Sequence, residues 1–98
     1  MKNRINVIVP VYGDKRSLEI CLLSLKKHYK QKKWLDIYFV NDVGPEADTL
    51  EKLILNLISD TSNFQYHRNS ENLGFVKNVN NATFNVVKDK KADVLLLN

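Results

Sequence analysis

The sequence has 98 residues, 44% of them hydrophobic, which suits a single domain with a modest core. The longest apolar run is far shorter than the roughly 20 residues of a membrane-spanning helix, and the start of the chain does not resemble a secretory signal, so we expect a cytoplasmic protein. Fifteen basic and eleven acidic residues give a net charge of +4, which favours anionic ligands without identifying one.

The chain opens with a predicted strand over Ile5–Pro10 and a predicted helix over Lys15–His28. Asp14 is placed to cap this helix. Cys21 is the only cysteine, which excludes an internal disulfide, and its place on the apolar face favours a small core residue. Apolar side chains recur at the three- and four-residue spacing of a buried helical face: Leu18, Cys21, Leu22, Leu25 and Tyr29.

Five lysines fall between Lys26 and Lys33, at the end of this helix. They complement the negative end of the helix dipole, so a solvated helix end explains them. The alternative is contact with an anionic membrane surface, which would place the protein at the inner face of the membrane. Nucleic acid is not an expected partner, because Tyr29 and Trp34 do not form a stacking platform.

The middle of the chain predicts a strand over Asp36–Asn41, a helix beginning near Pro45 and a strand over Phe64–Arg68. Proline suits the first position of a helix because its missing N–H would have had no partner there. The buried stripe of this helix comprises Leu50, Leu53, Ile54, Leu57 and Ile58.

A third helix is predicted over 74–88, and a strand over Ala92–Leu97 follows it. We expect one helical face to be buried, with a second row beside it: Phe75, Val79, Ala82 and Val86, then Val76, Thr83 and Val87. The strand is nearly all apolar, which is typical of a strand covered by helices on both faces.

Four strands alternating with three helices predict an open, mainly parallel α/β sheet with helices on both faces. If the third helix crosses back over the sheet, the last strand lies beside the first. Ligands bind in such sheets beyond the carboxyl ends of the strands, where the strand order reverses. We therefore expect a crevice between the loops that follow Pro10 and Leu97, with Asp42 on the same rim.

Four segments of the chain carry a family resemblance: Ile8–Gly13 with the first helix after it, Val40-Asn41-Asp42, Asn69–Phe75, and Asp93–Asn98. In this order and spacing they resemble the family 2 inverting glycosyltransferases of the GT-A fold, and the last segment matches the approach to the metal motif of that family. The chain would thus be the nucleotide-sugar-binding half of such an enzyme, a Rossmann-like unit over residues 1–98.

The resemblance implies that Pro10, Val11 and Tyr12 hold the base of a nucleotide-sugar. The Tyr12 ring would stack on the base, and backbone groups of Pro10 and Val11 would bind its edge. Asp42 would accept a hydrogen bond from the base, commonly uracil, which favours a UDP- or TDP-sugar. Two simpler interpretations stay open: Tyr12 as a rim aromatic packed on the first helix, and Asp42 as a turn or cap residue before Gly44.

Asn72 and Gly74 would approach the pyrophosphate or ribose of the same ligand, at the start of the third helix. The alternative is that Asn72 caps this helix and Gly74 permits its tight entry. Asn80 is expected to brace the adjacent loop. Val43 departs from the family, since a small residue often follows the aspartate.

Asn98 would be the first letter of an Asn-x-Asp metal motif, whose carboxylate binds Mg²⁺ or Mn²⁺ in the parent enzyme. Because that carboxylate and the general base would lie further along, we expect the 98 residues alone to bind no metal and to transfer no sugar. The parent's acceptor would be a polysaccharide, a lipid-linked glycan or a protein. We also expect self-association through the exposed edge of the last strand.

Other α/β functions fit less well. A Rossmann dehydrogenase would need a glycine-rich fingerprint after the first strand, where Gly13 is the only glycine. A receiver-like signalling domain would need an acidic pair there, which is missing. A non-catalytic nucleotide-binding or scaffold module of the same fold stays open as the alternative.

Overall fold

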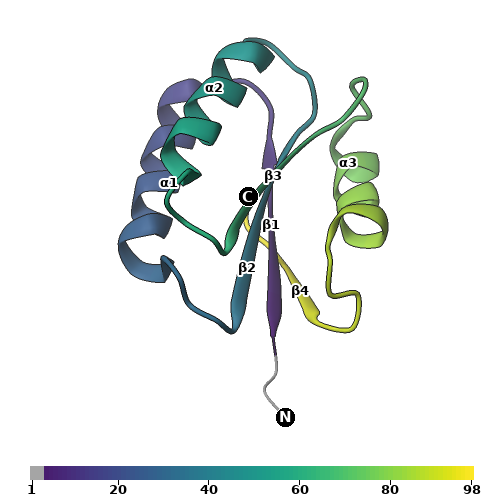
Figure 1. Ribbon diagram of the computed structural model, residues 1–98. Helices are drawn as coiled ribbons and strands as arrows, with labels where there is room; N and C mark the ends of the chain where they lie inside the picture. Colours follow the sequence, from purple (N-terminus) through teal and green to yellow (C-terminus); the bar gives the residue numbers. More distant parts are fainter. Residues whose placement is uncertain (1–3) are drawn as a thin grey trace.

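A parallel sheet of four strands runs through the protein in the order β3, β2, β1, β4 (Figure 1). The computed structural model describes residues 4–98. The order confirms that the chain crosses back after β3 and that the last strand pairs with the first. The strands are β1 Ile5–Val11, β2 Leu35–Asn41, β3 Phe64–Arg68 and β4 Asp93–Leu96.

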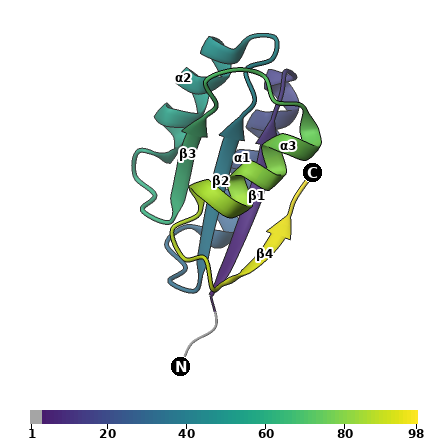
Figure 2. The ribbon, with the colours of Figure 1, turned by 90° about the vertical axis from the view of Figure 1, so that its right-hand side faces the viewer.

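Helices cover both faces of the sheet, as predicted. Helices α1 (Lys15–Tyr29) and α2 (Ala47–Ile58) lie together on one face. Helix α3 (Phe75–Asn81) continues into a π-helical turn, η1 (Ala82–Val86), and crosses the other face (Figure 2). Because all three strand connections contain a helix, every strand pair is parallel.

Two predicted helix boundaries are wrong. Helix α2 begins at Ala47 rather than near Pro45, because Glu46 has the left-handed φ of 61° that no right-handed helix contains. The third helix ends at Val86 rather than Lys88, because Val87 is extended. Its N–H reaches back five residues to the Ala82 carbonyl at 3.1 Å, which closes the π turn.

The larger core lies between the sheet and the helices α1 and α2. The carboxylate of Asp14 caps α1, accepting from the Ser17 N–H at 3.2 Å, so the predicted cap is confirmed. The buried residues of this core are Val7, Val9, Val11, Leu18, Leu22, Leu35, Ile37, Phe39, Leu50, Ile54 and Phe64. Leu18, Leu22 and Leu25 of α1 and the whole predicted stripe of α2 supply its helical side. The predicted burial of Tyr29 is wrong, since 39% of it is exposed at the end of α1.

A smaller core lies under α3 and η1, formed by Ile8, Tyr38, Val40, Ala82 and Val87. The predicted burial of Phe75 is wrong, since half of its surface is exposed. The buried residue in the first turns of α3 is Asn78. Helix α3 therefore buries a polar side chain, Asn78, next to the end of β2.

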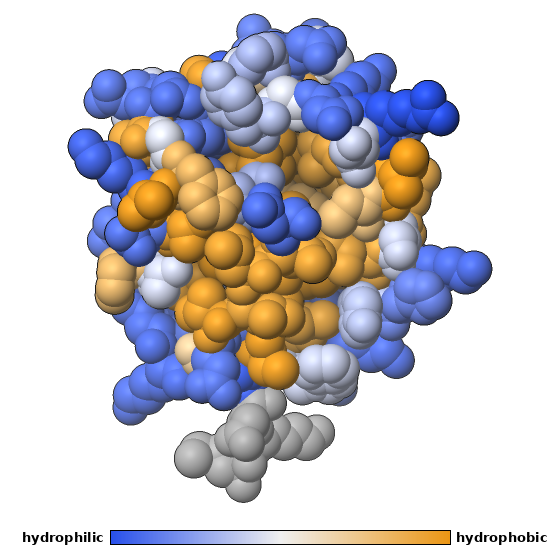
Figure 3. Space-filling view, turned by 180° about the vertical axis from the view of Figure 1, so that it is seen from behind, coloured by the Kyte–Doolittle hydropathy of each residue, from blue (hydrophilic) through white to orange (hydrophobic). Residues whose placement is uncertain are grey.

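Strand β4 is not covered as predicted. All four of its residues are exposed, including Val94 (41%), Leu95 (55%) and Leu96 (41%). It pairs with β1 and forms one edge of the sheet, while the helices lie over the strands further in. Figure 3 shows the resulting apolar surface across the back of the molecule.

The lysine-rich end of α1 is partly neutralised by one carboxylate. Asp60 forms ion pairs with Lys26 at 3.0 Å and Lys30 at 2.8 Å, and hydrogen bonds from Lys30 and Lys26 lower its pKa. Among residues 4–98, no helix is both long enough and apolar enough to cross a bilayer.

Candidate functional site

Strand register brings Tyr12 and Asp42 to the same edge of the sheet. Val11 on β1 pairs with Asn41 on β2, and the Asp42 N–H donates to the Val11 carbonyl at 3.0 Å. Tyr12 and Asp42 are thus the first residues beyond the paired ends of the two central strands. This is the edge where open parallel sheets bind ligands.

A cleft of about 340 Å³, here called the Tyr12–Asp42 cleft, opens at this edge. Its lining residues are Pro10, Tyr12, Asp42, Asn72, Gly74, Phe75 and Asn78. Five of the six residues predicted to bind a nucleotide are therefore brought together. Val11 is the exception: it is buried on the opposite side of β1, with 2% of its surface exposed.

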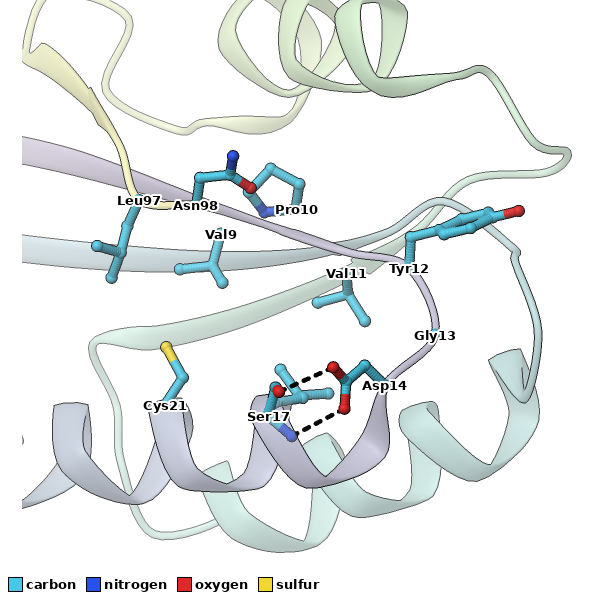
Figure 4. A pocket seen from close by; sticks show the side chains of 11 residues that line it. Val9, Pro10, Val11, Tyr12, Gly13, Asp14, Ser17, Cys21, Leu97 and Asn98 are labelled. Atoms are coloured by element: carbon cyan, nitrogen blue, oxygen red, sulfur yellow. Dashed lines mark hydrogen bonds between the residues drawn. The ribbon is translucent and has the colours of Figure 1, made fainter.

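A second cavity of about 230 Å³, the Asn98 cavity, lies on the α1 side of the same edge (Figure 4). It extends from Pro10, Val11 and Tyr12 to Leu97 and Asn98. The Leu97 N–H donates to the Ile8 carbonyl at 2.9 Å, which holds the end of the chain against β1. The predicted crevice between the loops after Pro10 and Leu97 is confirmed.

Tyr12 is 61% exposed, and its ring lies over the backbone of Gly44. A Cβ atom added to Gly44 would come within 2.2 to 2.9 Å of three ring carbons. The ring thus rests on the loop between β2 and α2, and it borders both cavities.

This loop, residues 42–46, holds two non-glycine residues in the left-handed region, Val43 (φ 56°) and Glu46 (φ 61°). The conformation is unfavourable for a β-branched residue such as valine. Asn41 stabilises it: its Oδ1 accepts from the Val43 N–H at 3.0 Å, and its Nδ2 donates to the Ala47 carbonyl at 3.1 Å.

The Asp42 side chain is buried, with 3% of the residue exposed, and both carboxylate oxygens accept hydrogen bonds from the loop before α3. Oδ1 accepts from Asn69 Nδ2 at 2.9 Å and from the Leu73 N–H at 2.8 Å. Oδ2 accepts from the Gly74 N–H at 3.0 Å and from Asn72 Nδ2 at 3.4 Å. Asp42 thus does not cap α2, the helix that follows it.

Asn72 is not the cap of α3 either. Its amide donates to the backbone carbonyl of Asp42 at 2.9 Å, and the residue at the helix start is Gly74. Gly74 has a φ of 87°, which explains why glycine suits this entry. Gly74 therefore has the predicted structural role of permitting the tight entry into α3, whereas Asn72 binds Asp42, the residue after β2.

Asn78 completes the polar floor of the cleft, and Asn69 holds it from outside the cleft lining. Asn69 Nδ2 donates to Asn78 Oδ1 at 2.7 Å, and Asn78 Nδ2 reaches the Val40 carbonyl at 3.4 Å. Both residues are buried, whereas Asn80, the residue predicted to brace the loop, is exposed. The signal for Asn78 was a polar residue inside an apolar helical face.

Phe75 is the second residue that the sequence did not place at the site. It is exposed and lines the Tyr12–Asp42 cleft together with Tyr12. An aromatic residue directly after the glycine that starts α3 was the available signal. The cleft therefore combines two aromatic side chains with a polar floor, which suits a flat, partly polar ligand.

The described residues do not form a metal site by themselves. Within residues 4–98, no three His, Cys, Asp or Glu side chains come together. Asn98, the residue predicted to begin the metal motif, lines the Asn98 cavity together with Asp14. The Asp14 carboxylate is held by the Ser17 N–H and by the Ser17 hydroxyl at 2.8 Å. These bonds lower the pKa of Asp14.

Comparison with known proteins identifies the family. The protein family described as Glycosyl transferase family 2 matches residues 6–90, which is most of the chain. The chain belongs to glycosyl transferase family 2. The matched range includes five of the family-like positions at the Tyr12–Asp42 cleft: Pro10, Tyr12, Asp42, Asn72 and Gly74. The comparison with curated proteins gives no match.

The fold agrees with this family assignment. The mannosyltransferase PcManGT from Pyrobaculum calidifontis, solved in complex with GDP-Man and Mn²⁺, matches with a TM-score of 0.66 at 16% sequence identity. The match covers 85% of this chain and 24% of that chain. The family 2 domain described here therefore spans about a quarter of the length of that enzyme.

Proposed function

We propose that this family 2 domain binds the nucleotide of a nucleotide-diphospho-sugar in the Tyr12–Asp42 cleft. It would serve as the donor-binding half of an enzyme that transfers the sugar with inversion. The observation that carries the proposal is that five predicted residues, from three separate segments of the chain, line one cleft at the carboxyl edge of the sheet.

The chemistry of the cleft supports a nucleotide rather than a purely apolar ligand. Tyr12 and Phe75 offer aromatic faces for a base, and the exposed Asn72 offers its amide oxygen to the polar edge of the base or to the ribose. A UDP- or TDP-sugar is the donor class we propose. For the whole enzyme we also propose a divalent cation, Mg²⁺ or Mn²⁺, and a polysaccharide, lipid-linked or protein acceptor.

Nucleotide titration followed by NMR tests the proposal. We expect UDP or TDP to bind the 98-residue chain with a dissociation constant of roughly 0.1 to 10 mM, and to shift amide signals around the cleft more than GDP or CDP does. Tyr12→Ala should weaken binding. The matched control is Tyr29→Ala, since Tyr29 is also an exposed tyrosine but lies at the far end of α1. Equal binding by both variants would remove Tyr12 from the site.

Sugar transfer by the 98 residues alone is not expected. The two carboxylates that line the cavities, Asp14 and Asp42, both accept hydrogen bonds from protein donors, which leaves neither poised to deprotonate an acceptor hydroxyl. The measurement is release of UDP or TDP from the sugar donor in the presence of Mn²⁺. Release of UDP or TDP by the pure chain would contradict the proposal that this domain binds the donor without transferring the sugar.

Contact with an anionic membrane surface is a further part of the proposal. Lys27, Lys32 and Lys33 form no ion pair among residues 4–98, in contrast to Lys26 and Lys30. Co-sedimentation with vesicles containing phosphatidylserine, compared with neutral vesicles, tests this contact. Equal recovery with both kinds of vesicle would exclude it.

A further inference from the structure

Phe75 faces the Tyr12–Asp42 cleft, although its place in the sequence predicts burial. The apolar pattern puts it at the beginning of the helical face that continues through Val79 and Ala82. Ala82 is fully buried, whereas half of the surface of Phe75 is exposed. The buried side chain in the first turns of α3 is Asn78. Phe75 therefore belongs to neither core, and its ring lines the cleft instead.

The cleft lies between Phe75 and Tyr12. Tyr12 borders both cavities at the carboxyl edge of the sheet, so it separates the cleft from the Asn98 cavity on the α1 side. Phe75 lines only the cleft, and it comes from α3, which crosses the opposite face of the sheet (Figure 2). Two aromatic side chains from separate segments of the chain thus bound the same space on two sides.

Exposure alone does not distinguish Phe75, because single apolar side chains are common on protein surfaces. Val76 and Phe84, on the same helical stretch, are 67% and 68% exposed, and neither lines the cleft. Phe75 differs from both because it shares a cleft with a second exposed aromatic residue and with the polar residues Asp42 and Asn72. This combination of groups points to a ligand.

A nucleobase suits this combination. Its flat faces stack on aromatic side chains, while its edge carries hydrogen-bonding groups. A base inserted between Tyr12 and Phe75 would turn its edge toward Asp42, which also lines the cleft. A phosphate group would gain little from two aromatic faces, because its oxygens bind N–H donors and cations.

We propose that Phe75 is a base-contacting residue, which packs on the face of the nucleobase opposite to the face that stacks on Tyr12. This inference rests on the proposed function, and it names the side chain that encloses the base on its second side. Binding then depends on the planarity of the base as well as on its hydrogen-bonding edge.

Intermolecular NOEs test this contact directly, without any substitution. With UDP bound to the 98-residue chain, we expect NOEs from the ring protons of both Phe75 and Tyr12 to the two carbon-bound ring protons of uracil. Both uracil protons should also shift upfield, because they lie between two aromatic faces. NOEs from Tyr12 alone, or NOEs from Phe75 to the ribose alone, would overturn the proposal.

A matched pair of substitutions measures the contribution of the ring. Phe75→Ala should weaken binding of uridine, UMP and UDP by the same factor, roughly tenfold, because all three ligands share the base. Phe84→Ala removes an equally exposed phenylalanine outside the cleft and should leave all three affinities unchanged. A loss in Phe75→Ala that is confined to UDP would place the side chain at the diphosphate. That result, or an equal loss in Phe84→Ala, would overturn the proposal.

A ligand with a saturated base separates stacking from hydrogen bonding. The base of 5,6-dihydro-UDP keeps the imide N–H and both carbonyl groups of uracil but is no longer planar, so it stacks poorly. We expect the natural chain to prefer UDP over this analogue. Phe75→Leu, which keeps an apolar side chain without a ring, should reduce that preference, whereas Phe75→Trp should retain it. An unchanged preference in Phe75→Leu would contradict a stacking role for Phe75.

Failure of the inference is distinguishable from failure of the proposed function. If no nucleotide binds the unmodified chain, the proposed function fails, and the role of Phe75 fails with it. If UDP binds and Tyr12→Ala weakens its binding, the proposed function stands. Phe75→Ala binding UDP as tightly as Phe84→Ala does would then overturn the inference alone.

Discussion

At the scale of single residues, the position of the Tyr12 ring depends on the absence of a side chain at Gly44. Gly44 does not have a positive φ, so its backbone would accept alanine. The obstacle is the ring, which lies within 2.2 to 2.9 Å of the place that a Cβ atom would take. Such contacts are far shorter than real Cβ contacts, so one of the two groups must move.

We therefore predict that Gly44→Ala displaces the Tyr12 ring. The free energy of unfolding should fall by at most about 1 kcal/mol, because the exposed ring can turn into solvent at less than the cost of overpacking a core, and nucleotide binding should weaken. Urea denaturation and NMR titration measure the two effects. In a Tyr12→Ala background the same substitution should cost almost nothing, since the ring is absent. An equal cost in both backgrounds would assign the effect to the backbone instead.

Val43 provides a prediction of the opposite sign. Its left-handed φ of 56° costs roughly 1 to 3 kcal/mol for a β-branched residue, whereas glycine adopts this conformation freely. After the loss of about 0.5 to 1 kcal/mol for the greater flexibility of glycine in the unfolded chain, Val43→Gly should stabilise the fold by about 1 kcal/mol. Val43→Thr, also β-branched, is the control and should bring no gain in urea denaturation.

At the scale of secondary-structure elements, one hydrogen-bonded group connects β2, α2 and β3 behind the site. Tyr66 on β3 donates its hydroxyl hydrogen to Glu51 on α2 at 2.9 Å and accepts from Asn41 on β2 at 3.1 Å. Burial, with Glu51 nearby, raises the pKa of Tyr66 to about 12. Because Asn41 also holds the Val43 N–H, this group supports the loop under Tyr12.

The raised pKa of Tyr66 predicts a loss of stability at alkaline pH. The folded value of about 12 lies above the ordinary value of 10, so the contribution is fully present below pH 10 and is lost as pH rises through 12. Tyr66 is only partly buried, which limits the effect to about 1 kcal/mol. Urea midpoints between pH 9 and 12 should fall more steeply for the natural chain than for Tyr66→Phe. Parallel curves would exclude Tyr66 as the cause.

Most of these elements could be predicted from the sequence, because apolar periodicity reports directly which helical faces and strands are buried. The same signal fails for Phe75 and β4, whose apolar side chains are exposed. The site was predictable only in part. Pro10, Tyr12, Asp42, Asn72 and Gly74 lie at or after strand ends or open a helix. The contact of the Tyr12 ring with Gly44 and the bond between Asn69 and Asp42 instead join residues far apart in the chain.

At the scale of the whole molecule, the two edges of the sheet differ in character. The β3 edge ends in Arg68, whose guanidinium binds Asp48 at 2.7 Å. The β4 edge exposes apolar side chains, and an apolar groove of about 260 Å³ adjoins it on the α1 side. The groove is lined by Ile5, Val7, Leu25, Tyr29, Trp34, Leu35, Ile37, Leu95 and Leu97. Lys90, Lys91 and Asp93 protect only the beginning of this edge.

An exposed edge strand of this kind is a template for pairing with another strand. We predict that two copies of the chain associate through antiparallel pairing of their β4 edges. This arrangement is two-fold symmetric, and it brings apolar side chains of each copy against the groove of the other.

Light scattering after size exclusion, at about 100 μM chain, should give a mass above 11.4 kDa that falls with dilution. Leu96→Lys should restore the monomer, whereas Leu55→Lys, at a similarly exposed leucine on α2, should not. A monomer at this concentration, unaffected by Leu96→Lys, would contradict the β4 interface.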